Sequence, residues 1–203
     1  MWKLLKRTVL LLVLGGVIYG CFLCRDQKLL GDQILRLHVV ADSDEAEAQA
    51  VKLQVRDAVL AVLDRLTDDA QSKEEVMAVV KENLAALEAA ANKVLQELDA
   101  KYHAAVSLEQ EEFPTRDYET FSLPSGVYDS LKVTIGSGEG KNWWCVVFPQ
   151  LCLPAASTQV EDVAVSAGFS QDLGKTLIRE DGYQVRFWLL DRLGEIQNFF
   201  HME

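Results

Sequence analysis

The residues best suited to chemistry gather in one segment, Gly136 to Cys152. Two adjacent tryptophans and two cysteines, Cys145 and Cys152, follow a glycine-rich turn there. In an oxidising compartment two cysteines this close in sequence can form a disulfide, which stabilises a fold by roughly 2–3 kcal/mol. We favour this disulfide over a pair of free buried thiols.

The alternative use of a cysteine is nucleophilic catalysis. A thiolate activated by a neighbouring imidazole attacks carbonyl groups, and His38 could serve as the base for Cys145. This pair predicts an exported cysteine hydrolase or transpeptidase of the cell envelope as the alternative function. A disulfide to Cys152 would consume the thiol, so we expect no catalytic residue and no enzyme.

The adjacent tryptophans predict a binding site. Neighbouring side chains on an extended or helical backbone rarely both point inward, so at least one indole should be accessible. Exposed indoles are typical anchors of protein interfaces. We therefore predict a partner-binding surface that joins the tryptophans, the loop before them and a polar segment near position 40: Trp143, Trp144, Asn142, Lys141, His38, Asp42, Ser43 and Asp44.

Nucleotide and metal sites are not indicated. Ile135 and Asn142 stand where a phosphate loop needs a glycine and a magnesium-binding hydroxyl. A calcium loop opening at Asp42 would need glycine where Glu47 stands, and the three histidines are far apart in the sequence. We expect no metal, no cofactor and no small-molecule substrate.

The composition excludes one further class of partner. The chain of 203 residues has 20 basic and 31 acidic side chains, a formal net charge of −11. Binding to nucleic-acid phosphates needs cationic groups, so nucleic acid is not expected. With 49% hydrophobic residues the chain can bury a core of ordinary size.

An apolar segment near the N-terminus predicts contact with a membrane. Lys3, Lys6 and Arg7 precede the uncharged stretch from Thr8 to Cys24, which as a helix would span roughly 25 Å. Basic residues stay on the cytoplasmic side, so the rest of the chain is exported. The segment is either a signal-anchor or a signal peptide cleaved after Gly20, and lipidation of Cys21 is a weaker alternative.

Beyond this segment, periodicity predicts an α+β fold. A polar stalk at 25–33 leads to a half-buried strand at 34–41, with Arg36 and His38 on its solvent side. Capping boxes predict helix starts at Asp42 and at Ser72, and the two helices should pack antiparallel. The apolar stripes of these helices are Val51, Val55, Val59, Val62 and Leu66, then Val76, Val80, Leu84, Leu87, Ala91, Val94 and Leu98.

Alternating residues predict further strands at 102–112, 118–123 and 127–135, with a turn at Pro124 to Gly126. A final amphipathic helix is indicated by Val185, Leu189, Leu193, Ile196 and Phe200. The predicted fold is thus a small antiparallel sheet packed by an antiparallel helix pair, with an N-terminal membrane segment and a C-terminal amphipathic helix. The predicted units are 1–24, 25–33, an exported signalling domain at 34–154, and an extension at 155–203.

Several of these stretches resemble the stage II sporulation protein R family. The resemblance rests on separated motifs in register: Leu35 to Asp44, Lys52 to Asp57, Phe113-Pro-Thr115, Pro124 to Tyr128 and Asn142 to Cys152. It covers roughly residues 1–154. The family usually has Asn-Ser-Asp where this chain has Asp42-Ser43-Asp44, which keeps a capping residue and adds a charge.

The resemblance implies a signalling protein rather than a catalyst. Members of the family are made in the forespore and exported into the space between the forespore and mother-cell membranes. There they switch on a membrane-embedded aspartic protease, which matures a sporulation sigma-factor precursor. The resemblance thus implies a membrane-anchored or secreted protein whose partner is that protease.

Overall fold

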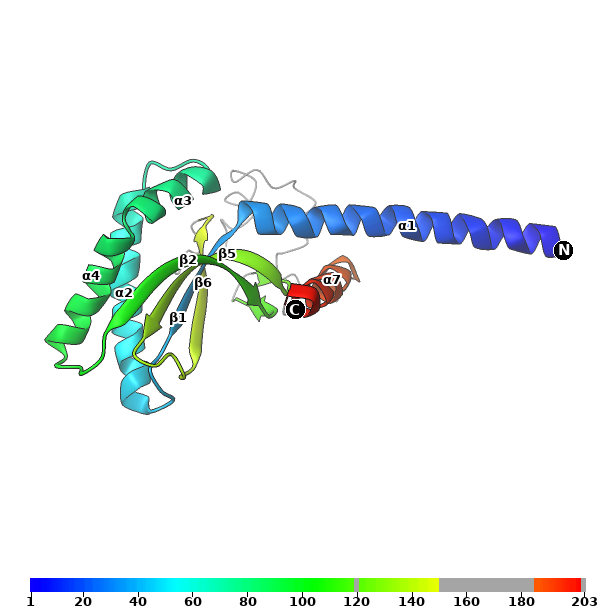
Figure 1. Cartoon of the computed structure of the whole chain (residues 1–203). Helices are drawn as coiled ribbons and strands as arrows, with labels where there is room; N and C mark the ends of the chain where they lie inside the picture. The colour runs from blue at the N-terminus through cyan, green and yellow to red at the C-terminus, as the bar shows by residue number, and fades with distance from the viewer. Residues whose placement is uncertain (119–120, 150–184, 202–203) are drawn as a thin grey trace.

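The computed structural model describes residues 1–118, 121–149 and 185–201 and shows an α+β fold with a long protruding helix (Figure 1). The elements in chain order are α1 (Trp2–Gln33), β1 (Leu35–Val40), α2 (Ala46–Thr67), α3 (Lys73–Glu82), α4 (Leu84–Glu97), β2 (Ala104–Phe113), β3 (Arg116–Asp117), β4 (Ser122–Leu123), β5 (Gly126–Ile135), β6 (Asn142–Phe148) and α7 (Val185–His201).

The central sheet is mixed, with strand order β2-β5-β1-β6. β1 pairs with β5 in parallel and with β6 in antiparallel orientation, so the prediction of a purely antiparallel sheet was wrong. After the three helices the chain enters the sheet as β2, which is antiparallel to β5. The return from β2 to β5 reverses the direction again and makes β5 parallel to β1. β6 was not predicted as a strand.

β1 is a central strand and is buried along its whole length. The prediction that Arg36 and His38 face solvent was therefore wrong: their exposed fractions are 0% and 8%. Both side chains belong to the sheet face opposite the α2–α4 layer. Period-two alternation identified the two faces correctly, but it could not show that both are covered.

The helices α2, α3 and α4 cover one sheet face (Figure 1). The capping box predicted at Ser72 is present, since its hydroxyl accepts a hydrogen bond from the Glu75 N–H at 3.2 Å. The one predicted at Asp42 is absent: α2 begins at Ala46, and its N-cap Glu45 makes no side-chain cap bond. The second predicted helix is divided at Asn83 into α3 and α4.

The core under these helices largely follows the predicted stripes. Val51, Val55 and Val59 of α2 are buried, and so are Leu87 and Ala91 of α4. Leu63 and Leu95 are buried where the stripes named Val62 and Val94, which lie at the edge of the same core. One-residue shifts of this kind arise because the packed face of a helix drifts relative to any fixed spacing.

α1 projects from the domain over most of its length (Figure 1). It is long and apolar enough to cross a membrane. No residue from Trp2 to Phe22 is buried, and as helix these residues span about 32 Å, close to the thickness of a bilayer core. From Leu23 onward the helix is docked on the domain, with Leu23, Gln27 and Leu30 buried.

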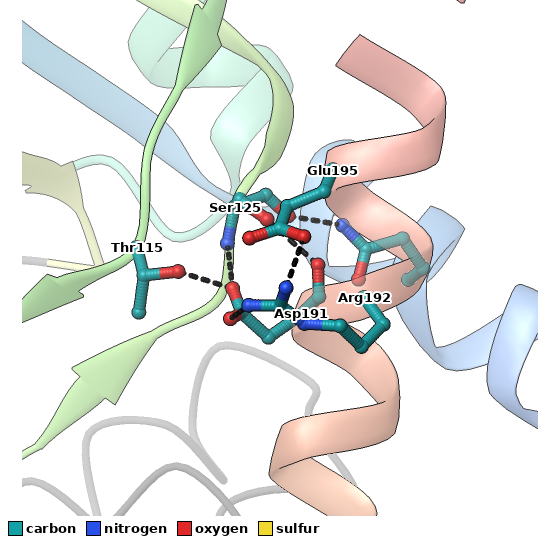
Figure 2. A network of polar contacts seen from close by, with 6 residues as sticks. Thr115, Ser125, Asp191, Arg192 and Glu195 are labelled. Atoms are coloured by element: carbon teal, nitrogen blue, oxygen red, sulfur yellow. Dashed lines mark hydrogen bonds and ion pairs between the residues drawn. The ribbon is translucent and has the colours of Figure 1, made fainter. Parts of the chain in front are cut away.

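α7 packs beside the docked end of α1 and carries a polar network (Figure 2). The Asp191 carboxylate accepts hydrogen bonds from the Ser125 N–H at 3.0 Å and from the Thr115 hydroxyl. Gln27 of α1 donates to the Ser125 carbonyl at 2.9 Å. A Cβ at position 194 would overlap that carbonyl, so close packing of α7 requires Gly194.

The C-terminal helix is present as predicted, but its packed face differs. Leu190, which the predicted stripe omitted, is fully buried, whereas Ile196 is exposed. Leu189 and Leu193 pack at the edge of the cluster that contains Leu190. The side chains of Val185 and Phe200 lie outside the described part of the chain.

Candidate partner-binding surface

The predicted binding residues meet at one corner of the sheet. β1 and β6 run antiparallel, and their register sets Asn142, Trp143 and Trp144 opposite Val40, Val39 and His38. The segment after β1 carries Asp42, Ser43 and Asp44, and the loop before β6 ends in Lys141. We call this set of eight residues, which the sequence analysis named, the β1–β6 corner.

Hydrogen bonds between Asp42 and Ser137 hold the loop at 136–141 against the end of β1. The Asp42 carboxylate accepts from the Ser137 N–H at 2.7 Å, and the Asp42 carbonyl accepts from the Ser137 hydroxyl at 2.8 Å. Gly136 has φ +58°, and a Cβ there would overlap the Asp42 carboxylate. Asp42 thus organises the loop rather than capping α2.

A buried lysine fixes the outer side of the same loop. Lys52 of α2 donates from Nζ to the Lys141 carbonyl at 2.8 Å and to the Gln49 Oε1 at 2.7 Å. Gln49 in turn donates to the Ser43 carbonyl at 2.8 Å. Burial lowers the pKa of Lys52, and the nearby Asp44 opposes that effect. The exposed side chains of Lys141 and Asp44 therefore stand on a fixed backbone.

The two tryptophans project to opposite faces of the sheet, because successive residues of a strand alternate. Both are half-buried. Trp143 packs against the core under α2–α4, and the Arg56 guanidinium lies 4.8 Å from its ring centre. Neither indole is wholly a core residue, which agrees with the expectation that at least one is accessible.

Trp144 belongs to an aromatic and cationic group on the other face. Its ring centre lies 4.6 Å from that of His38 and 5.1 Å from that of Phe113, the latter in an edge-to-face arrangement. The Arg116 guanidinium covers the indole at 4.4 Å. Within the described chain the buried indole Nε1 has no hydrogen-bond partner.

A charged network runs from Trp144 across the face. His38 Nδ1 lies 3.1 Å from both carboxylate oxygens of Glu111, and His38 Nε2 lies 2.8 Å from the Asn142 Oδ1. Lys132 Nζ binds Glu111 at 2.8 Å. Burial by itself would raise the pKa of Glu111, but the hydrogen bonds from His38 and Lys132 lower it to about 2.

The geometry does not assemble the cysteine and histidine of the alternative enzyme. Cys145 is buried in the core under α2–α4, whereas His38 contacts Trp144 and Phe113 on the opposite face. A base must reach the proton that it removes, and the sheet separates these two side chains. Cys152 lies outside the described residues, so the disulfide to Cys145 stays a prediction.

Some members of this surface were missed by sequence reasoning. They are charged residues supplied by neighbouring elements: Arg56, Glu111, Arg116 and Lys132. The alternating pattern of β2 and β5 assigns Glu111 and Lys132 each to one face of its strand. Their contact with His38 could not be predicted, because the pairing of β1 with β5 was not recognised. Nothing in the local sequence marks Arg56 or Arg116. No group of three potential metal-binding side chains occurs within the described residues.

Comparison with known proteins agrees with the sequence resemblance. A family model described as stage II sporulation protein R matches residues 31–158. The stage II sporulation protein R of Bacillus subtilis (strain 168) is 28% identical over 224 aligned positions, which cover 95% of this chain and 99% of the relative. No solved structure matches the chain.

Proposed function

Because the chain belongs to the stage II sporulation protein R family, we propose that it is an exported signal that passes from the forespore to the mother cell. In this proposal it activates a membrane-embedded aspartic protease, which then matures a sporulation sigma-factor precursor. The protein acts in the space between the two membranes, anchored by α1 or released from it. Its part in the reaction is recognition rather than chemistry.

The observation that best supports the recognition step is the arrangement of residues in the β1–β6 corner. Two half-buried tryptophans follow a loop whose backbone is held by Asp42 and Lys52. A rigid loop loses little conformational entropy on binding, and a half-exposed indole supplies apolar area next to polar groups. The corner also lies at the end of β1 that points away from α1, so the anchor leaves it accessible (Figure 1).

The recognition step is tested by reconstituting the protease, its precursor substrate and the full-length chain. An interface anchor contributes about 2 kcal/mol or more, which is roughly a 30-fold loss of affinity on removal. We expect this loss for Trp143→Ala or Trp144→Ala, measured as the concentration of protein needed for half-maximal precursor cleavage. Melting of each variant is followed in parallel, and unfolding of both or normal activation by both would refute the corner as the binding site.

A pair of lysine substitutions provides a control that does not touch the core. Lys141 is exposed at the corner and Lys81 is exposed on α3. Lys141→Glu should weaken activation while Lys81→Glu leaves it unchanged, with both proteins melting like the wild type. Equal effects of the two substitutions would show that general charge, not the corner, governs activation.

Topology is tested independently of the corner. With Lys3, Lys6 and Arg7 held in the cytoplasm, a reporter fused after Glu203 should be active only if it functions outside the cytoplasm. An active cytoplasmic reporter at this position would reverse the topology and with it the proposed route of the signal.

A further inference from the structure

α7 leaves a row of large apolar side chains uncovered at the place where α1 leaves the domain. Trp188, Ile196 and Phe199 are 45%, 54% and 61% exposed. Positions 188, 192, 195 and 199 follow the three- and four-residue spacing of a single helix face, and Ile196 lies beside them. The opposite face of α7 holds Leu190, Asp191 and Gly194, which are buried on the domain.

α7 is held close to the boundary between the docked and the protruding parts of α1. Leu190 shares a buried cluster with Leu23, the first buried residue of α1, and Gln27 and Asp191 are joined through Ser125 (Figure 2). Figure 1 shows α7 beside the docked end of α1, on the side of the sheet from which α1 projects.

The same boundary carries aromatic residues on α1 itself. Tyr19 and Phe22 are exposed just before Leu23, and Trp2 is exposed at the far end of the helix. Aromatic residues at both ends of an apolar helix are typical of the two membrane–water interfaces. The outer interface therefore lies near Tyr19 and Phe22, at the level at which α7 is docked.

The charges on the exposed face of α7 are paired within the helix. Arg192 contacts the Asp191 carboxylate at 3.0 Å and also binds Glu195. The face thus offers no excess of positive charge to anionic headgroups. A groove of about 590 Å³ lies between α7 and the docked end of α1, and Cys24, Lys28 and Ile196 line part of it.

From these observations we infer that the exposed face of α7 lies in the outer membrane–water interface as a second, amphipathic membrane contact beside α1. Its occupant is the headgroup and upper acyl-chain region of the bilayer, engaged through Trp188, Ile196 and Phe199. Such helices bury an apolar face in the interface without crossing the membrane. This inference rests on the part of the proposed function in which α1 is inserted in the membrane.

The test uses tryptophan quenching in the full-length chain reconstituted in phosphatidylcholine vesicles with brominated acyl chains. Trp2→Phe removes the tryptophan of the anchor, and Trp143 and Trp144 remain as references at the distant corner. We expect bromolipids to quench the Trp2→Phe protein and to lose most of that effect in Trp2→Phe/Trp188→Phe. Bromine close to the headgroup should quench Trp188 more strongly than bromine near the chain end.

The outcomes separate this inference from its premise. Quenching of Trp2, measured as the difference between wild type and Trp2→Phe, reports insertion of α1. If Trp2 is quenched and Trp188 is not, or if deep bromine quenches Trp188 more strongly, the interfacial placement of α7 is wrong while the anchor stands. If neither tryptophan is quenched, α1 is not inserted and both ideas fail.

Discussion

The sheet face under α2, α3 and α4 is lined by aliphatic side chains, whereas the opposite face holds Arg36, His38, Glu111 and Lys132 among aromatic rings. Both faces arise from the same strands, one residue apart. Burying charges is costly unless they are paired, so a sheet selected for stability alone would repeat the aliphatic pattern. The difference indicates that the first face contributes more to the folding energy than the second.

The largest expected difference concerns two neighbours on β5. Leu131 is fully buried under the helices, and Ser130 is buried on the opposite face. Leu131→Ala removes apolar contacts and leaves a cavity, which should lower the free energy of unfolding by about 2–5 kcal/mol. Ser130→Ala creates no cavity and should cost about 1 kcal/mol or less. Urea unfolding of the two variants checks the contrast, and equal losses would contradict it.

The loss of stability at low pH should depend on Glu111, which lies on the sheet face opposite α2–α4. Folding lowers the pKa of Glu111 from 4.5 to about 2, so the unfolded chain takes up a proton more readily than the folded one. The resulting stabilisation, about 3 kcal/mol, is fully present above pH 4.5 and is lost as the pH falls toward 2. Glu111→Gln should remove this part of the pH dependence. Parallel acid-limb curves for both proteins would exclude it.

Alanine substitutions at Ser72 and at Asp42 should distinguish an effect on stability alone from an effect on both stability and signalling. Ser72 caps α3, whereas Asp42 clamps the loop of the β1–β6 corner. Each substitution by alanine should cost about 1 kcal/mol. Only Asp42→Ala should also reduce protease activation, and Asp42→Asn, which keeps an acceptor oxygen, should largely restore it. A signalling defect in Ser72→Ala of the same size would end this distinction.

The smallest expected effect is at Arg36. Its guanidinium lies 4.0 Å from the Phe113 ring centre and donates to the Tyr118 hydroxyl at 3.0 Å. Within the described chain its Nε and Nη1 have no hydrogen-bond partner. Arg36→Met retains volume and removes a buried charge, so stability should change by less than about 1 kcal/mol or rise. A loss of several kcal/mol in thermal unfolding would show that the cation stabilises this face.

Local signals predicted the elements that local forces determine. The apolar run at 8–24, the Ser72 cap and the strand around Leu37 all follow from neighbouring residues, and each has its counterpart in the structure. The eight corner residues were named together because the glycine loop and the tryptophans are unusual residue types, although the pairing of β1 with β6 that brings them together was not predicted. Their role in binding stays a prediction.

The features that could not be predicted depend on pairing between strands that are distant in the sequence. The parallel match of β1 with β5 and the addition of β6 depend on contacts across roughly a hundred residues, which no periodicity encodes. The same pairing explains Asp42: a carboxylate that could cap α2 finds a better donor in Ser137, which is distant in sequence. Burial of Arg36 and His38 likewise depends on covering elements from elsewhere in the chain.

α1 passes into β1 with only Ile34 between them, and Ile34 is itself buried. The globular part is therefore joined to α1 without a flexible linker. The six residues of β1 extend about 20 Å from that junction to the corner, so a membrane-held copy presents its tryptophans at one fixed height. The docked part of α1, from Leu23 to Gln33, adds about 16 Å to this length. In the proposed function, contact with a receptor in a facing membrane would therefore require the two bilayers to approach within the combined length of the two segments.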